Sequence, residues 1–230
     1  MIPTRAPILS TRAAIAPPPP TGLTMLYVFD SSRSAAVEAN DLELQAHFAT
    51  LGFTITEVED GAGDAAVYDT GYDVTWVGDI SSTNFNDWPG RGLNVVLVEV
   101  FSTDDVGMIL EVNRVQDNGN EGYYDAADAG HPILAPFTPG TDIVYGTGVV
   151  QRLSTDTPLG SKILSQNSGP AGRGRALVMA MDVGDGYQVA GPGLADGRWV
   201  YFGCRRQAAP YTADGLTLAG RCALWAAGSI

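Results

Sequence analysis

The sequence predicts an α/β domain with a largely parallel central sheet, on two observations. An apolar run at 25–29 precedes a helical pattern at 34–51 and a strand-like run at 54–58, an order that implies parallel strands joined by a right-handed crossover. Two further runs, at 74–77 and 94–100, are mostly apolar on both faces, as in a sheet covered by helices on each side.

Local signals place the ends of the first elements. The first strand is expected to end at Asp30, before a serine-rich turn. Ser34 is expected to precede the first helix and Gly52 to stop it, because serine is frequent at helix N-caps and glycine just beyond helix C-termini. The apolar positions of this helix share one face: Val37, Leu44, Phe48 and Leu51.

Beyond Val112 the pattern shifts toward β structure. We expect strands at 142–150, 176–182 and 198–204, separated by glycine-rich turns. A closing helix is expected from about Thr212 to Ala227, where apolar side chains return.

Two oxygen-rich segments, 117–121 and 182–186, could be taken for calcium loops. Neither has the alternating acid spacing of an EF-hand, so both are interpreted as solvated turns. The glycine-rich segment 191–197 opens no helix and therefore lacks the geometry that holds a dinucleotide. We expect no metal and no cofactor.

Charge and hydropathy exclude two classes of partner. The chain has 13 Lys and Arg residues against 26 Asp and Glu, a formal charge of −13 that repels the phosphate backbone of nucleic acids. No apolar stretch approaches the roughly 20 residues that span a bilayer, and no signal peptide is evident, so neither a membrane partner nor export is expected. Cys204 and Cys222 could be two buried thiols or could pair with each other.

Residues 1–22 are interpreted as a proline-rich arm that precedes a domain at 23–230. The arm has no helical or strand period, and its prolines favour a partly polyproline II conformation. It is either a disordered tail or a segment that docks on a neighbouring subunit. The side chains expected to contact a partner are Ile2, Pro3, Ile8, Leu9, Ile15, Pro17, Pro18, Pro19 and Pro20.

Several short motifs resemble class I glutamine amidotransferase-like domains, and three are similar to the trehalose-utilisation (ThuA-like) branch of that superfamily. The first group comprises Leu26–Asp30, Leu51–Phe53 and Tyr72–Val74; the ThuA-like motifs are Gly130–Ile133, Arg198–Gly203 and Leu224–Gly228. The resemblance spans about residues 24–228. It implies a three-layer flavodoxin-like fold whose ligand site lies at the carboxyl ends of the strands.

In catalytic members of this superfamily a cysteine follows a central strand on a tight turn. The matching turn here, 98–103, holds Ser102 and no cysteine, and Ser102 fits a helix cap better than a nucleophile. The resemblance therefore implies a domain without the catalytic cysteine. Its strand ends would still form a vestigial pocket, with candidate residues Asp30, Ser31, Asp79, Glu99, Ser102 and His131.

The histidines and large aromatic residues are further candidates. His131 precedes a proline and is either a structural turn residue or part of the pocket, whereas His47 is expected at an edge or on the surface. Trp76 is expected in the core. The candidates for exposed aromatic platforms are Trp88, Tyr123 and Tyr124.

Two functions remain open. The first is a non-catalytic structural or interaction protein whose arm fastens the body to other protein subunits; its specific form would be a bacteriophage decoration (cement) protein, bound to capsid protein in the virion. The alternative is a ThuA-like enzyme or binding module, located in the cytoplasm, that acts on a carbohydrate-derived small molecule.

Overall fold

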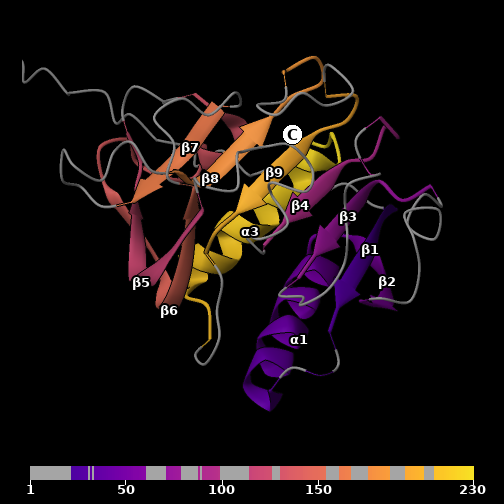
Figure 1. Ribbon diagram of the computed structural model, residues 1–230, viewed down its shortest axis with the longest axis horizontal. Coiled ribbons are helices and arrows are strands. Elements are labelled where there is room, and N and C mark those ends of the chain that lie inside the picture. Colours follow the sequence, from indigo (N-terminus) through magenta and orange to yellow (C-terminus); the bar gives the residue numbers. More distant parts are fainter. Residues whose placement is uncertain are drawn as a thin grey trace, which may run out of the picture.

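The computed structural model describes residues 22–30, 32, 34–60, 71–78, 88, 90–98, 114–125, 130–153, 161–166, 176–186, 195–204 and 210–230. Within these ranges, nine strands form one sheet in the order β2-β1-β3-β4-β9-β8-β6-β5-β7 (Figure 1). The strands are β1 (Leu23–Phe29), β2 (Phe53–Glu59), β3 (Val74–Val77), β4 (Val95–Leu97), β5 (Arg114–Tyr123), β6 (Asp142–Leu153), β7 (Ser161–Gln166), β8 (Ala176–Met181) and β9 (Trp199–Phe202). The helices are α1 (Ala35–Thr50), α3 (Ala213–Ala226) and the short 3-10 helix η4 (Pro132–Leu134).

Five adjacent strands, β2, β1, β3, β4 and β9, are parallel. Counted in chain order, they have the 2-1-3-4-5 arrangement of flavodoxin-like sheets, in which the direction of strand succession reverses between β1 and β3. The predicted α/β fold with a parallel centre is confirmed. Ligands of open α/β sheets bind outside the carboxyl ends of the strands at such a reversal, here the lower edge of the sheet in Figure 1.

The other four strands are antiparallel to their neighbours, and the pairings β8–β6, β6–β5, β5–β7 and β7–β8 link them in a ring. The sequence did not predict β5 or β7. Residues 117–121, expected to form a solvated turn, lie within β5, which has a bulge between Gly119 and Glu121. That expectation was wrong because pairing with β6 satisfies the backbone hydrogen bonds of this segment despite its polar side chains.

The two long helices lie side by side and cover one face of the sheet. Phe48 of α1 packs there on Trp76 of β3, with 4.7 Å between ring centroids. The opposite face carries a second buried cluster that includes Trp88. The exposed positions expected for Trp88 and Tyr124 are wrong: Trp88 is fully buried because this face also requires an apolar cover, and Tyr124 is buried against the first face.

Local chemistry explains where the helices begin and end. Ser34 is the N-cap of α1, and Gly52 follows its end with φ +93°, as predicted. Thr212 caps α3 by accepting a hydrogen bond from the Gly215 N–H at 3.0 Å. A Cβ atom on Gly215 would overlap the carbonyl oxygen of Tyr145 on β6, so the absence of a side chain lets α3 approach the sheet closely.

The cysteines are both free thiols in buried positions, Cys204 just after β9 and Cys222 in α3. This matches the first of the two alternatives. Burial raises the pKa of the Cys222 thiol far above its usual range, so it stays protonated at neutral pH.

Candidate functional site

The carboxyl ends of the central strands meet at one edge of the sheet, which we call the carboxyl edge. Backbone hydrogen bonds keep these ends level: the Gly78 N–H donates to the carbonyl of Val28 at 2.9 Å, and the Val98 N–H donates to that of Val77 at 3.0 Å. Asp30 follows β1 directly. Its Oδ1 atom accepts hydrogen bonds from the backbone N–H and the hydroxyl of Ser32, at 2.8 and 2.5 Å, which fixes the carboxylate at the strand end.

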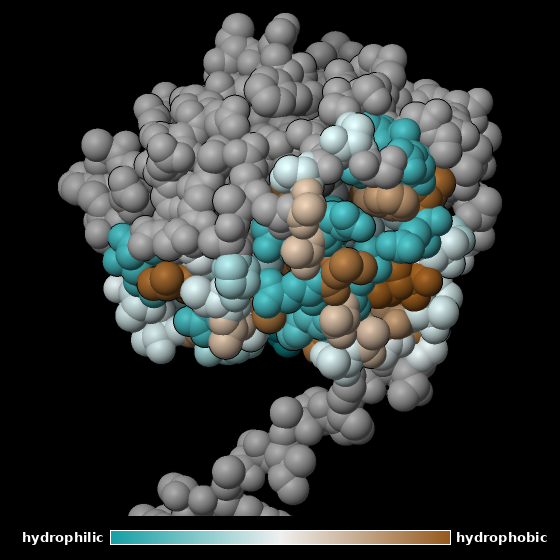
Figure 2. Space-filling model, turned by 90° about the horizontal axis from the view of Figure 1, so that it is seen from below, coloured by the Kyte–Doolittle hydropathy of each residue, from teal (hydrophilic) through white to brown (hydrophobic). Residues whose placement is uncertain are grey.

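A cleft of about 270 Å³ opens beside this edge, between α1 and the ends of β1 and β2. Four carboxylates, one amide and two apolar side chains line it: Asp30, Glu38, Asp41, Glu57, Gln45, Phe29 and Leu42. Figure 2 views the molecule from this side and shows hydrophilic and hydrophobic side chains intermingled on its described part. Leu42 is 57% exposed, so the cleft offers an apolar contact at its mouth.

Besides Asp30, two more of the four carboxylates are held, by partners on the sheet and on α1. The Tyr27 hydroxyl donates to Oδ1 of Asp41 at 2.7 Å, and the Gln45 amide donates to Oε1 of Glu57 at 2.8 Å. Burial, reinforced by the charge of Asp41, raises the pKa of Tyr27 well above its usual value. Tyr27 therefore remains a hydrogen-bond donor at physiological pH, and it orients Asp41 toward the cleft.

The chemistry of this cleft is that of a hydrogen-bond acceptor. None of the described residues that line it is basic. Carboxylate oxygens accept hydrogen bonds from hydroxyl or ammonium groups, and the Gln45 amide can donate as well as accept. The cleft suits a small ligand with several donors and some apolar surface, and its charge disfavours anions.

Two of the predicted pocket residues, Asp30 and His131, are among the described residues, and of these two Asp30 lines the cleft. Ser31, Asp79, Glu99 and Ser102 lie outside the described residues. The arm residues also lie outside them: Ile2, Pro3, Ile8, Leu9, Ile15, Pro17, Pro18, Pro19 and Pro20.

His131 lies at the opposite, amino edge of the parallel strands. Its imidazole contacts Trp225 at the end of α3, with 5.2 Å between ring centroids. The Nδ1 atom accepts a hydrogen bond from the Ile133 N–H at 3.3 Å, so His131 caps η4. Burial lowers the pKa of this histidine, which favours the neutral ring. The geometry gives His131 a structural task, away from Asp30.

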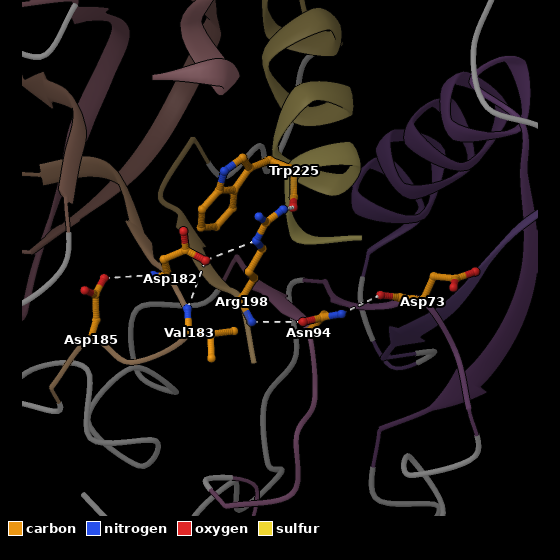
Figure 3. Close-up of polar contacts among 7 residues, drawn as sticks. All are labelled: Asp73, Asn94, Asp182, Val183, Asp185, Arg198 and Trp225. Atoms are coloured by element: carbon orange, nitrogen blue, oxygen red, sulfur yellow. Dashed lines mark hydrogen bonds and ion pairs between the residues drawn. The ribbon is translucent and has the colours of Figure 1, made fainter. Parts of the chain in front are cut away.

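A polar network that includes Trp225, the residue whose ring His131 contacts, connects several elements at the amino edge (Figure 3). Arg198, just before β9, donates from Nε to Asp182 at 3.1 Å and from Nη1 to the Trp225 carbonyl at 2.9 Å. Its backbone N–H donates to Oδ1 of Asn94, whose amide donates in turn to the carbonyl of Asp73 at 3.1 Å. The network thus connects the starts of β3, β4 and β9 with the end of α3, and it is a structural clamp.

Comparison with solved structures determines the class of this fold. The chain aligns with the crystal structure of a protein described as ThuA-like from Parabacteroides merdae, with a TM-score of 0.54 over 89% of this chain and 90% of that one. The chain has a ThuA-like fold. The two sequences are 12% identical, so the likeness concerns the fold alone. No protein-family model and no curated protein sequence matches the chain.

Within the ThuA-like fold, sequence reasoning missed most of the cleft. A signal was present: Glu38, Asp41, Leu42 and Gln45 recur at spacings of three and four residues, which places them on one face of α1. Nothing in the sequence shows that this face meets Glu57 on β2.

No helix within the described ranges is long and apolar enough to cross a membrane.

Proposed function

We propose that this chain is a ThuA-like binding module that takes a small, hydroxyl-rich molecule of carbohydrate origin in the carboxyl-edge cleft, without forming a covalent intermediate. The observation that carries this proposal is the position of the cleft: it opens at the carboxyl end of β1, on the side of β2 and α1, and β1 is one of the two strands between which the strand order reverses. Open α/β sheets hold their ligands in this region.

The lining supports a sugar-like ligand. Fixed carboxylates, such as Asp41 and Glu57, accept hydrogen bonds from neighbouring hydroxyls, while Phe29 and Leu42 can contact the C–H surface of a ring. The volume of about 270 Å³ lies just below the range of drug-sized pockets, roughly 300–1,000 Å³, which favours a ligand of one or two sugar units.

The sequence supports the non-covalent part of this proposal. The turn that would carry the nucleophile, residues 98–103, contains no cysteine, and Ser102 lacks the flanking glycines of a G-x-S-x-G nucleophile elbow.

Calorimetric titration with a panel of monosaccharides, disaccharides and sugar acids tests the proposal. We expect binding of at least one neutral member, weakened about 10-fold to 100-fold in the Asp41→Asn and Glu57→Gln variants, since a hydrogen bond to a charged group contributes about 1.5–3 kcal/mol. The matched control is Asp142→Asn, an exposed acid on β6 that should leave binding unchanged. Mass spectrometry should recover the ligand intact, and its turnover would favour the enzyme alternative.

A second candidate is a structural protein that joins a larger assembly through its arm, for example as a decoration protein of a virion. The observation that favours it is a separation of charge along the sequence. Residues 1–22 hold two of the 13 basic residues and none of the 26 acidic ones, which leaves eleven basic against 26 acidic residues, a formal charge of −15, in the rest of the chain. Basic and acidic surfaces of this kind steer subunits together.

A further inference from the structure

The carboxyl-edge cleft and the arm have complementary chemistry. Four carboxylates and two apolar side chains line the cleft. Within the arm, residues 8–16 form a proline-free segment that has Arg12 at its centre and the apolar side chains Ile8, Leu9 and Ile15 around it. A guanidinium group pairs well with carboxylates, and the aliphatic side chains match the exposed Leu42.

The direction of β1 places the start of the arm and the cleft at opposite edges of the sheet. The arm enters β1 at Leu23, on the amino edge, whereas the cleft lies beside Phe29 and Asp30 at the other end of the strand, about 20 Å away at roughly 3.3 Å per residue. Four consecutive prolines precede β1 by only two residues, and they favour a stiff polyproline II rod of about 12 Å. To reach its own cleft, the arm would have to reverse at those two residues, and Gly22 has a φ of +91° that suits a turn. An arm that continues away from the amino edge reaches a second copy instead.

We propose that the cleft of one copy receives the 8–16 segment of the arm of a second copy, head to tail. The arm leaves the domain at the amino edge and the cleft lies at the carboxyl edge, so every copy can give one arm and accept another. A heterologous contact of this kind does not close at two subunits, and it builds rings or open chains. One consequence rests on the proposed function: the arm and the small ligand compete for the same cleft.

Sedimentation velocity of the full-length protein tests the contact. At 50 mM salt we expect a concentration-dependent series of oligomers beyond the dimer, which dissociates at 500 mM salt because the attraction is largely electrostatic. Reversing the arm charges, Arg5→Glu with Arg12→Glu, should weaken association at least 10-fold. Reversing the cleft charges, Glu38→Arg with Glu57→Arg, should weaken it equally.

Two further proteins separate docking from general charge effects. The control reverses two acids outside the cleft, Glu121→Arg with Asp142→Arg, and should associate like the wild type. The protein that combines the arm and cleft reversals carries complementary charges again and should recover association. A variant that loses its helical circular dichroism signal is unfolded and is left out of the comparison. The salt dependence of wild-type association then tests the proposal.

Three results would overturn the proposal: a wild-type protein that is monomeric at 100 µM and 50 mM salt, a combined variant that stays monomeric although folded, or a monomer whose arm crosslinks to its own cleft. Titration of the arm-reversed variant with sugars tests the proposed function separately. If no sugar binds this variant, the proposed function is wrong, whereas the oligomer series tests only the docking of the arm.

Discussion

Replacing Gly215 with alanine should destabilise the protein, although alanine is the better helix former. Gly215 lies in the first turn of α3, where the helix approaches β6. A new Cβ atom would overlap the backbone carbonyl of Tyr145, and that oxygen already accepts a hydrogen bond from the Thr212 N–H at 3.0 Å. Neither backbone can yield without loss of the other contacts between α3 and the sheet.

The size of the effect follows from two opposing terms. Helix propensity favours alanine over glycine by about 1 kcal/mol. Overpacking costs about 1–3 kcal/mol, and the upper end applies where the obstacle is backbone. The net loss for Gly215→Ala is therefore about 2 kcal/mol, which lowers the Tm of a domain of this size by roughly 4–8 °C.

Gly220, one and a half turns further along α3, is the matched comparison. Its Cβ atom would lie 2.5 Å from Cδ1 of Leu51 and 2.9 Å from Nε2 of His47, both of which are ends of side chains that can rotate. Gly220→Ala should thus stay within about 1 kcal/mol of the wild type, because propensity offsets a smaller strain. Urea unfolding followed by tryptophan fluorescence measures both variants. A Gly215→Ala protein as stable as Gly220→Ala would refute the close approach of α3 to β6.

Three further predictions concern stability and reactivity. Arg198→Ala should cost about 2 kcal/mol in urea unfolding, because it removes a partly exposed ion pair, a hydrogen bond at the end of α3 and a cation–π contact at 4.9 Å; a loss below 0.5 kcal/mol would argue against the clamp. Burial lowers the pKa of His47 and of His131, so the unfolded state binds more protons than the folded state below about pH 6.5. The unfolding free energy should therefore fall as the pH drops from 7 to 5. This fall should be less steep when both histidines are replaced by glutamine. The thiols of Cys204 and Cys222 should react with an aromatic disulfide reagent only after denaturation, and rapid labelling of the native protein would contradict their burial.

The parallel half of the fold is predictable because its signals are local. The pattern from Met25 to Val58 contains a strand, a capped helix, a glycine stop and a second strand, and each agrees with the others. The strands β5 and β7 escaped prediction because their sequences are polar and rich in Asn, Gly, Ser and Gln. Only pairing with distant strands makes them β structure.

The candidate site also contains one residue that the sequence predicted and others that it did not. Asp30 was found because it ends a predicted strand, and the ends of parallel strands share an edge. Asp41 and Glu57 were missed because their proximity depends on how α1 crosses β2, which no local pattern encodes. His131 had been grouped with the pocket by resemblance, yet its contact with Trp225 keeps it at the amino edge.

Binding in the carboxyl-edge cleft is tested directly by a map of backbone amide shifts by NMR during titration with the sugar that binds best in calorimetry. We expect shifts that saturate and gather at residues 29–30, 38–45 and 57, with none at Asn94 or Arg198 on the amino edge. Saturating shifts at the amino edge, or no shift at the cleft for any sugar of the panel, would contradict it.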